Sequence, residues 1–348
     1  MTPPTMPHLA QADSAQSESI RSGVLSDVAD YLIALGHDPT PVYAQLGIDT
    51  PALANRDNRV PTSAVMTLLN RCAEITGQDD FGLRVAERRG MPDLGPIVLL
   101  LNRESTLRGA LHTLAQALHL HSNALYISFD EGERSAVLAM DVMTGGVGLS
   151  RHSAEMVVSA MLYMVHWLLG SDWRPQAVCF RHEARLPERV YRRYLRCRPD
   201  FGQEFNGVVI DRADLDRALD HATGKIRRQA EHFIATLADE SETFVYRVRQ
   251  LLVLTLPRGD ARADTIATLL GADRRTIHRR LARAGLNFST LLDRVRRELA
   301  MQYVTSSAKP FSDIALILGF ESLSVFSRWF RQAFGNSPTA VRRRAASE

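Results

Sequence analysis

The stretch Ile266–Gly285 reads IATLLGADRRTIHRRLARAG, and a second stretch, Ile314–Gly335, reads IALILGFESLSVFSRWFRQAFG. Each stretch opens with an Ile-Ala pair, carries Leu-Gly shortly afterwards, continues with apolar residues and arginine, and closes on glycine. Apolar positions of the second copy lie over apolar positions of the first when the two are aligned. A repeat of this length indicates a duplicated supersecondary unit.

Each copy has the pattern of a helix-turn-helix. Gly271 and Gly319 follow the last apolar residue of a short helix, where a left-handed residue ends a helix. Asp273 and Ser322 then stand where a side chain that caps the next helix belongs. The second helix is predicted over 274–284 in the first copy and 323–334 in the second. Its inward residues, spaced i and i+4, are Ile277, Leu281, Phe326 and Phe330.

The outward faces of these two second helices carry cationic and hydrogen-bonding side chains, which is what a reader of the major groove needs. The candidate DNA-contacting residues are Arg274, Arg275, Thr276, His278, Arg279, Arg280, Ser322, Ser324, Ser327, Arg328, Arg331 and Gln332. Packed helix hairpins with solvated basic faces are the alternative, and two copies in register favour DNA binding.

A predicted helix separates the two copies. Residues 289–306 place Leu291, Val295, Leu299 and Val304 at helical spacing. Eighteen helical residues span roughly 27 Å. Two reading helices held that far apart can enter successive major grooves, which recur at about 34 Å.

Residues 263–344 resemble the DNA-binding domain of the AraC/XylS family. The residues that carry the resemblance are the Ile-Ala and Leu-Gly pairs, Arg279-Arg280-Leu281, Gly285, Phe320, Ser322, Phe326-Ser327-Arg328, Phe330, Gly335 and Ser337-Pro338. The resemblance implies two helix-turn-helix units that act in one monomer on double-stranded promoter DNA, with RNA polymerase as a further partner. Leu323 departs from the pattern, since many members have a polar residue there, so this helix is expected to touch thymine methyls or sugars.

The charge is divided unevenly along the chain. Residues 256–348 contain 16 Lys and Arg against 8 Asp and Glu, whereas the remainder contains 26 against 31. A basic end on an acidic body fits a nucleic-acid binder whose other domain avoids phosphate. Arg342, Arg343 and Arg344 are expected to hold the DNA backbone from a flexible tail.

The N-terminal part is predicted to be an α+β domain of helices with a small antiparallel sheet. Two segments, 125–129 and 136–142, flank the turn signal Asp130-Glu131-Gly132-Glu133 and indicate a hairpin. Further strands are expected at 177–181 and 207–210. Helices are expected at 24–35, 41–46, 63–76, from Asp80 onward, 107–120, 150–169 and 187–196, and 96–101 is an apolar run of uncertain type.

Residues 24–219 resemble the arabinose-binding-type N-terminal domain found in one branch of this family. The segments that carry the resemblance are Arg59-Val60-Pro61, Asp80 to Arg84, Leu94-Gly95-Pro96, Ser105-Thr106-Leu107 and Phe205-Asn206-Gly207 with Asp211 and Leu215. Such domains are taken to sense a small molecule or to dimerise, and the nature of the ligand does not transfer.

These features predict four segments in the 348 residues. Residues 1–20, which are rich in Pro, Ser, Gln and Ala, are a disordered tail without the features of a signal peptide. Residues 21–221 form the effector or dimerisation domain, 222–256 a helical connector, and 257–348 the all-α DNA-binding domain with two helix-turn-helix units. Three scattered cysteines suggest a reducing cytoplasm, and the most apolar stretch, 156–170, is too short to span a bilayer.

Catalytic and metal chemistry find little support in the sequence. No nucleophile-elbow, P-loop or dinucleotide-binding motif is present, so an enzyme is not expected. His119 and His121 would share a face of a strand but lack a third ligand, so neither a metal site nor a cofactor is expected. His152 and Glu155, spaced i and i+3 on a helix, could form a carboxylate–histidine pair, but a solvated helix face is the expectation. Polar groups that could converge on a small-molecule ligand are His121, Asn123, Arg151, His152 and Tyr163, although the favoured alternative is that they satisfy one another or water.

The sequence therefore predicts a cytoplasmic, nucleoid-associated transcription regulator, most often an activator by family resemblance. Its N-terminal domain would control DNA binding through a small-molecule effector, through homodimerisation, or both. A ligand-independent architectural DNA-binding protein is the alternative.

Overall fold

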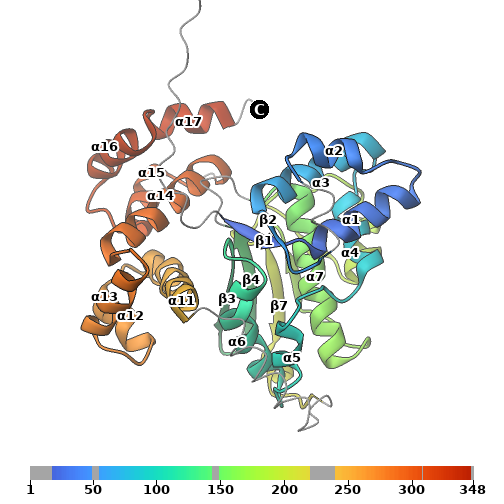
Figure 1. Ribbon diagram of the computed structural model, residues 1–348, viewed down its shortest axis with the longest axis horizontal. Coiled ribbons are helices and arrows are strands. Elements are labelled where there is room, and N and C mark those ends of the chain that lie inside the picture. The colour runs from blue at the N-terminus through green and yellow to red at the C-terminus, as the bar shows by residue number, and fades with distance from the viewer. Residues whose placement is uncertain (1–17, 49–54, 143–148, 220–239, 308, 346–348) are drawn as a thin grey trace, which may run out of the picture.

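The computed structural model describes residues 18–48, 55–142, 149–219, 240–307 and 309–345. Two clusters of buried apolar side chains divide this part of the chain. The first is built from residues before 220, with Tyr246 added, and the second from residues after 240. Figure 1 shows the sheet standing between α7 and the C-terminal helices.

The first core is covered by helices close to the predicted ones. The run of uncertain type at 96–101 forms a short helix, α5. The helices of this part are α1 Gly23–Ala34, α2 Thr40–Gln45, α3 Thr62–Thr76, α4 Phe81–Arg89, α5 Ile97–Leu101, α6 Leu107–Ala117, the 3-10 turn η2 Leu118–Leu120, α7 Arg151–Leu169, α8 Glu188–Leu195 and α9 Arg212–Leu215.

A five-stranded sheet, in the order β3-β4-β7-β5-β6, forms one wall of this core. Its strands are β3 Leu125–Glu131, β4 Ser135–Val142, β5 Ala177–Cys179, β6 Pro199–Asp200 and β7 Gly207–Asp211. The predicted hairpin is β3-β4, and its turn begins two residues later than expected, at Gly132, because β3 continues through Glu131. The sheet is antiparallel apart from the short β5-β6 pair, which is parallel.

A separate pair of strands joins the start of the chain to the loop before α3. These strands are β1 Ser19–Arg21 and β2 Arg59–Pro61, and they pair antiparallel. The expectation of a disordered tail over 1–20 is therefore wrong for Ser19 and Ile20, and Ile20 is buried in the first core. Residues 1–17 lie outside the described ranges.

The longest helix of the first core begins at a capped residue and packs closely on α4. The Ser150 hydroxyl accepts from the backbone N–H of Ser153 at the first turn of α7, which satisfies one of the free donors there. Gly82 of α4 lies against the backbone of α7: an added Cβ would stand 2.1 Å from the carbonyl oxygen of His152. This contact needs a residue without a side chain.

The second core is built only from helices in the described residues. They are α11 Glu240–Thr255, the 3-10 turn η3 Leu256–Arg258, α12 Ala263–Leu269, α13 Arg274–Arg283, α14 Phe288–Ser306, α15 Phe311–Ile317, α16 Leu323–Phe334 and α17 Pro338–Ala345. None of the helices in the described part of the chain is both long and apolar enough to cross a membrane.

The helix expected as a connector packs into this second core. Residues 222–239 of the expected connector lie outside the described ranges. In α11, however, Phe244, Val248 and Leu252 are buried among the residues of α12, α13 and α14. The described part of α11 is therefore continuous with the helix-turn-helix units, not a free spacer before them.

Side chains of α11 bind the open edge of β3, and a side chain of α14 binds the outer face of the sheet. The Tyr246 hydroxyl donates to the carbonyl of Leu125 at 2.9 Å, and the Gln250 amide donates to the carbonyl of Ile127 at 3.1 Å. Gln302 of α14 donates to the carboxylate of Asp141, which also binds Arg181. One face of the β3-β4 hairpin thus borders the first core, and the other borders the C-terminal helices.

Candidate nucleic-acid interface

The two turns of the repeat have the same local geometry. Gly271 and Gly319 have φ of 62° and 72°, a left-handed conformation that strains any residue with a Cβ. After each turn a side chain caps the next helix. Asp273 accepts from the Thr276 N–H at 2.6 Å, and Ser322 accepts from the Val325 N–H at 3.3 Å. The predicted turns and caps are confirmed.

The inward residues of α13 and α16 fix which faces of these helices point outward. Ile277, Leu281, Phe326 and Phe330 are fully buried, as their spacing predicted. In α16 the ring of Phe326 lies 5.6 Å from that of Phe330, so the helix is held by aromatic packing. The opposite faces are consequently open to solvent.

All twelve candidate DNA-contacting residues keep some exposure. Thr276 and Ser327 are half-buried, and the other ten are exposed. Leu323, the apolar residue at the start of α16, is 44% exposed and so is not part of the core. The two outward faces carry Arg275, His278 and Arg279 on α13 and Ser324, Arg328, Arg331 and Gln332 on α16.

Several of the twelve have contacts within the protein; the His278 ring, for example, lies 6.5 Å from the Phe288 ring. Arg274 lies 3.7 Å from the Asp264 carboxylate, and the Arg280 guanidinium lies over the Phe244 ring at 5.1 Å. The Ser322 hydroxyl is used as a helix cap. Within the described ranges, by contrast, no hydrogen bond or ion pair holds the guanidinium of Arg279 or Arg328.

The spacer helix α14 ties the two units into one body. It has 19 residues and begins after Asn287, whose side chain accepts from the Thr290 N–H at 2.8 Å. Arg296 donates to the carbonyl of Leu318 at 3.1 Å, in the turn of the second unit. A helix of this length spans roughly 28 Å, so the predicted separation of the reading helices is available.

A cationic residue outside the repeat lies beside the first helix-turn-helix unit. Arg247 of α11 and Arg280 line one cleft of about 360 Å³ together with Phe244 and Thr276. From the sequence, Arg247 was expected in the connector, because the packing of α11 on α13 depends on tertiary contacts that the sequence does not show. The signal for this packing in the sequence is the helical spacing of Phe244 and Val248, which are both buried in the second core.

The expectation of a flexible arginine tail is wrong. Residues 338–345 form α17, and the Arg342 Nε donates to the carbonyl of Val304 at 3.0 Å. The Arg342 guanidinium also lies 4.0 Å from the centre of the Phe311 ring. Arg342 therefore fastens α17 to α14 and α15.

The candidate ligand residues do not gather at one place. His121 is buried beside α7, whereas Asn123 accepts from the Ser19 N–H at 2.7 Å. Arg151 and His152 lie together at the start of α7, where the Arg151 guanidinium is 3.1 Å from the His152 Nε2. Tyr163 is half-buried near the other end of α7, and burial raises its pKa. His119 and His121 lie at the end of the η2 turn, not on a strand.

Glu155 was expected on a solvated helix face, and this prediction is wrong. This carboxyl is fully buried; the Tyr191 hydroxyl donates to it at 3.0 Å and Arg151 lies 3.6 Å away. Burial raises the pKa of Glu155 to about 7. Burial, followed by the charge of Arg151, lowers the pKa of the neighbouring His152 to about 4.

Comparison with known proteins agrees with this geometry. The family described as "Arabinose-binding domain of AraC transcription regulator, N-term" matches residues 36–219, and the family described as "Helix-turn-helix domain" matches residues 266–344. The first match covers more than half of the chain. The chain belongs to the AraC family of transcription regulators. It is a DNA-binding regulator and not an enzyme.

Individual relatives of this AraC-family regulator span most of its length. It is 29% identical over 326 residues to "HTH-type transcriptional regulator VirS" of Mycobacterium tuberculosis, covering 93% of this chain and 96% of that protein. It is 30% identical over 222 residues to "Ornithine utilization regulator" of Pseudomonas aeruginosa, covering 63% and 64%. The crystal structure of the transcriptional regulator CdpR from Pseudomonas aeruginosa overlaps 87% of this chain and 96% of that chain, with 19% identity and a TM-score of 0.41.

Proposed function

We propose that this regulator is a transcription activator whose α13 and α16 read adjacent major-groove segments of one promoter site. The observation that carries the proposal is the pair of outward faces, one on each copy of the repeat, held by a single rigid spacer helix. Arg275, His278, Arg279 and Arg328 contact bases or phosphates, and Arg280 and Arg331 contact phosphates. RNA polymerase is the partner through which the bound protein acts.

The N-terminal domain controls this binding through a small-molecule effector, through homodimerisation, or both. What supports the proposal is its contact with the DNA-binding helices: Gln250, Tyr246 and Gln302 all bind the β3-β4 hairpin. A change in that hairpin reaches the reading helices through α11 and α14. The protein acts in the cytoplasm, at the nucleoid.

Two substitutions test the reading faces. Arg279→Ala and Arg328→Ala each remove one cation that binds no described partner, so the fold should remain intact. Each should weaken binding to a promoter fragment by about tenfold or more, because a base-reading arginine contributes about 1–3 kcal/mol of discrimination. Fluorescence anisotropy at fixed salt measures this, and circular dichroism checks the fold.

A matched control is Arg71→Ala, which removes an exposed cation from α3, far along the chain from the repeat. It should leave the affinity for DNA unchanged. Wild-type affinity in both Arg279→Ala and Arg328→Ala would contradict the assignment of the reading faces.

Footprinting separates the proposal from an architectural DNA-binding role. A regulator protects one discrete site upstream of its target, whereas an architectural protein covers the fragment uniformly. Transcription from the same fragment by purified RNA polymerase then tests activation: the transcript should increase when the protein is added. A decrease would show repression instead.

A further inference from the structure

An apolar cavity lies behind the sheet of the N-terminal domain. Its volume is about 70 Å³, several times the roughly 10–15 Å³ that one water molecule needs. Four of the chain's ten methionines line it: Met140 from β4 and Met156, Met161 and Met164 from α7. Because methionine is unbranched and flexible, such walls re-pack around an occupant. The cavity can therefore widen to receive a molecule of about the size of one ring.

One neutral polar group faces this cavity. His121 lines it and is only 7% exposed, and its Nδ1 has no hydrogen-bond partner among the described residues. Burial, with a further contribution from the charges of Arg89 and Arg21, lowers the pKa of His121 to about 3. The ring is therefore uncharged at neutral pH. A buried and unbonded ring nitrogen costs free energy that a hydroxyl group would recover.

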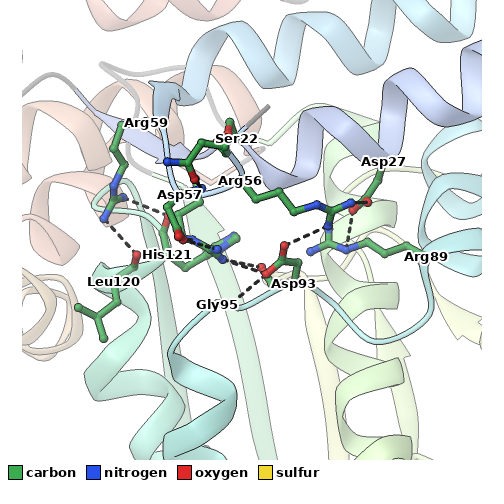
Figure 2. A network of polar contacts seen from close by, with 12 residues as sticks. Ser22, Asp27, Arg56, Asp57, Arg59, Arg89, Asp93, Gly95, Leu120 and His121 are labelled. Carbon is green, nitrogen blue, oxygen red and sulfur yellow. Dashed lines mark hydrogen bonds and ion pairs between the residues drawn. The ribbon is translucent and has the colours of Figure 1, made fainter. Parts of the chain in front are cut away.

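The charged residues around the cavity are held by one another. Figure 2 shows Arg89 directed at Asp27, and their Nε and Oδ2 atoms lie 3.0 Å apart. Arg21 binds Asp93 at 3.0 Å, and Arg59 donates to the backbone carbonyl of His121 at 3.1 Å. This network fixes His121 at the wall and leaves little charge for an ionic ligand, so the walls favour a neutral one.

The cavity and the DNA-binding helices share a strand. In β4, Met140 pairs with Ile127 and faces the first core, and the next residue, Asp141, pairs with Tyr126 on the opposite face. Tyr126 packs against the second core, and Asp141 accepts from Gln302 of α14. An occupant that displaces Met140 therefore displaces the strand that α14 binds.

We propose that this cavity is the effector site of the regulator and that it takes a small apolar molecule carrying one hydroxyl group. The inference deepens the effector role proposed above and rests on it. The apolar walls bind the hydrocarbon part, and a ring nitrogen of the neutral His121 accepts a hydrogen bond from the hydroxyl group. Displacement of β4 then alters the contact between Asp141 and Gln302.

Calorimetry on the full chain tests the site with phenol and with toluene, which has a methyl group in place of the hydroxyl. Phenol should bind saturably with one molecule per chain and about fivefold more tightly than toluene, the factor expected for one neutral hydrogen bond. In His121→Leu this preference should be lost or reversed, because the phenol hydroxyl would be buried without a hydrogen-bond partner. Equal binding of both probes to the wild type would overturn the role of His121.

Filling the cavity gives a second test with a matched control. Ala160 lines the cavity from α7 and is half-buried; Ala64 of α3 is half-buried and does not line it. Ala160→Phe should abolish phenol binding, and Ala64→Phe should retain it. Binding that persists in a folded Ala160→Phe would overturn the site.

NMR spectra of the methionine methyl groups test the site in the wild-type protein, so the result does not depend on whether a cavity-filling variant folds. With ¹³C-methyl methionine, phenol should shift the signals of Met140, Met156, Met161 and Met164, which Met→Leu variants assign one by one. Shifts confined to the other methionines, or no saturable shift, would overturn the site.

Promoter affinity measured with and without saturating phenol tests the effector role. We expect a change of about fivefold or more, as coupled sites show, and no change in Ala160→Phe. Bound phenol without a change in affinity would overturn the effector role and leave DNA binding intact. Failure of the proposed regulatory function is seen separately, as the absence of a discrete footprint without any ligand.

Discussion

At the residue scale, the buried Glu155 links the N-terminal domain to pH. Its carboxyl is fully buried between Arg151 and Tyr191, and its second oxygen, Oε2, has no hydrogen-bond partner among the described residues. Burial outweighs the attraction of Arg151, so the pKa rises from 4.5 to about 7. The folded protein therefore keeps this proton at pH values where the unfolded chain has lost it.

The sign of the pH dependence follows from that difference. Below about pH 4.5 both states hold the proton, and between 4.5 and 7 only the folded state does, so the free energy of unfolding falls as pH rises. The loss is on the order of 3 kcal/mol across this window and stays constant above it. Urea unfolding at pH 5, 6, 7 and 8 should show Glu155→Gln gaining stability relative to wild type as pH rises.

The difference between wild type and Glu155→Gln isolates this group from the others that titrate nearby. His152, whose pKa is lowered to about 4, acts in the opposite direction in both proteins. A difference that does not change between pH 5 and pH 8 would show that Glu155 titrates at its ordinary pKa in the folded state.

Residue-scale features were predictable from the sequence where they depend on local spacing. Asp273 and Ser322 cap helices because each stands directly after a left-handed glycine turn and before an apolar i, i+4 pair. Glu155 could not be predicted, because its burial depends on Tyr191, 36 positions away. The position of Arg247 beside Arg280 could not be predicted for the same reason, since the two residues share a cleft only after α11 packs on α13.

At the element scale, the contact between α4 and α7 depends on one glycine. An added Cβ at Gly82 would stand 2.1 Å from the backbone oxygen of His152, a distance that no side-chain movement relieves. Gly82→Ala should therefore push the helices apart and cost about 1–3 kcal/mol of stability, the range for overpacking. Thermal and urea unfolding of the full chain measures the loss.

Gly109 of α6 is the matched control. The Cβ of an alanine there would meet the end of the Glu104 side chain at 2.5 Å, and that side chain can move away. Gly109→Ala also gains helix propensity, worth up to about 1 kcal/mol. It should be neutral or stabilising, and an equal loss in both variants would contradict the explanation from helix contact.

Most elements follow from sequence patterns, and the exceptions have a common cause. The helix-turn-helix units, α3, α6, α7 and the β3-β4 hairpin show clear periodicity and clear turn signals, so their existence was predictable. The parallel pairing of β5 with the two-residue β6 was not, because such short segments carry no pattern of their own. The strand β1 at Ser19–Arg21 exists through its pairing with Arg59–Pro61, about 40 positions later in the sequence.

At the scale of the whole molecule, the five-stranded sheet is the wall between two cores. Its inner face carries Ile127 and Met140 into the first core, and its outer face presents Tyr126 and Asp141 to the DNA-binding helices. Arg258 reaches Asp130 at 2.6 Å, and Lys309 binds Glu204, so ion pairs surround the same interface. Sequence periodicity predicted both domains but could not predict which face of the hairpin would meet α14.

The place where the DNA-binding domain begins can be tested directly. Six apolar side chains of α11 and η3 are buried in the second core: Phe244, Val245, Val248, Leu252, Val253 and Leu256. Without these buried side chains the free energy of unfolding would fall by on the order of 10 kcal/mol, which is comparable with the whole stability of a domain of this size.

A fragment of residues 240–348 should therefore unfold cooperatively and bind promoter DNA. A fragment of residues 259–348 retains both helix-turn-helix units but should melt without a cooperative transition and bind DNA weakly. Circular dichroism melting and anisotropy at the same salt compare the two, and equal stability of the fragments would show that α11 adds nothing to the second core.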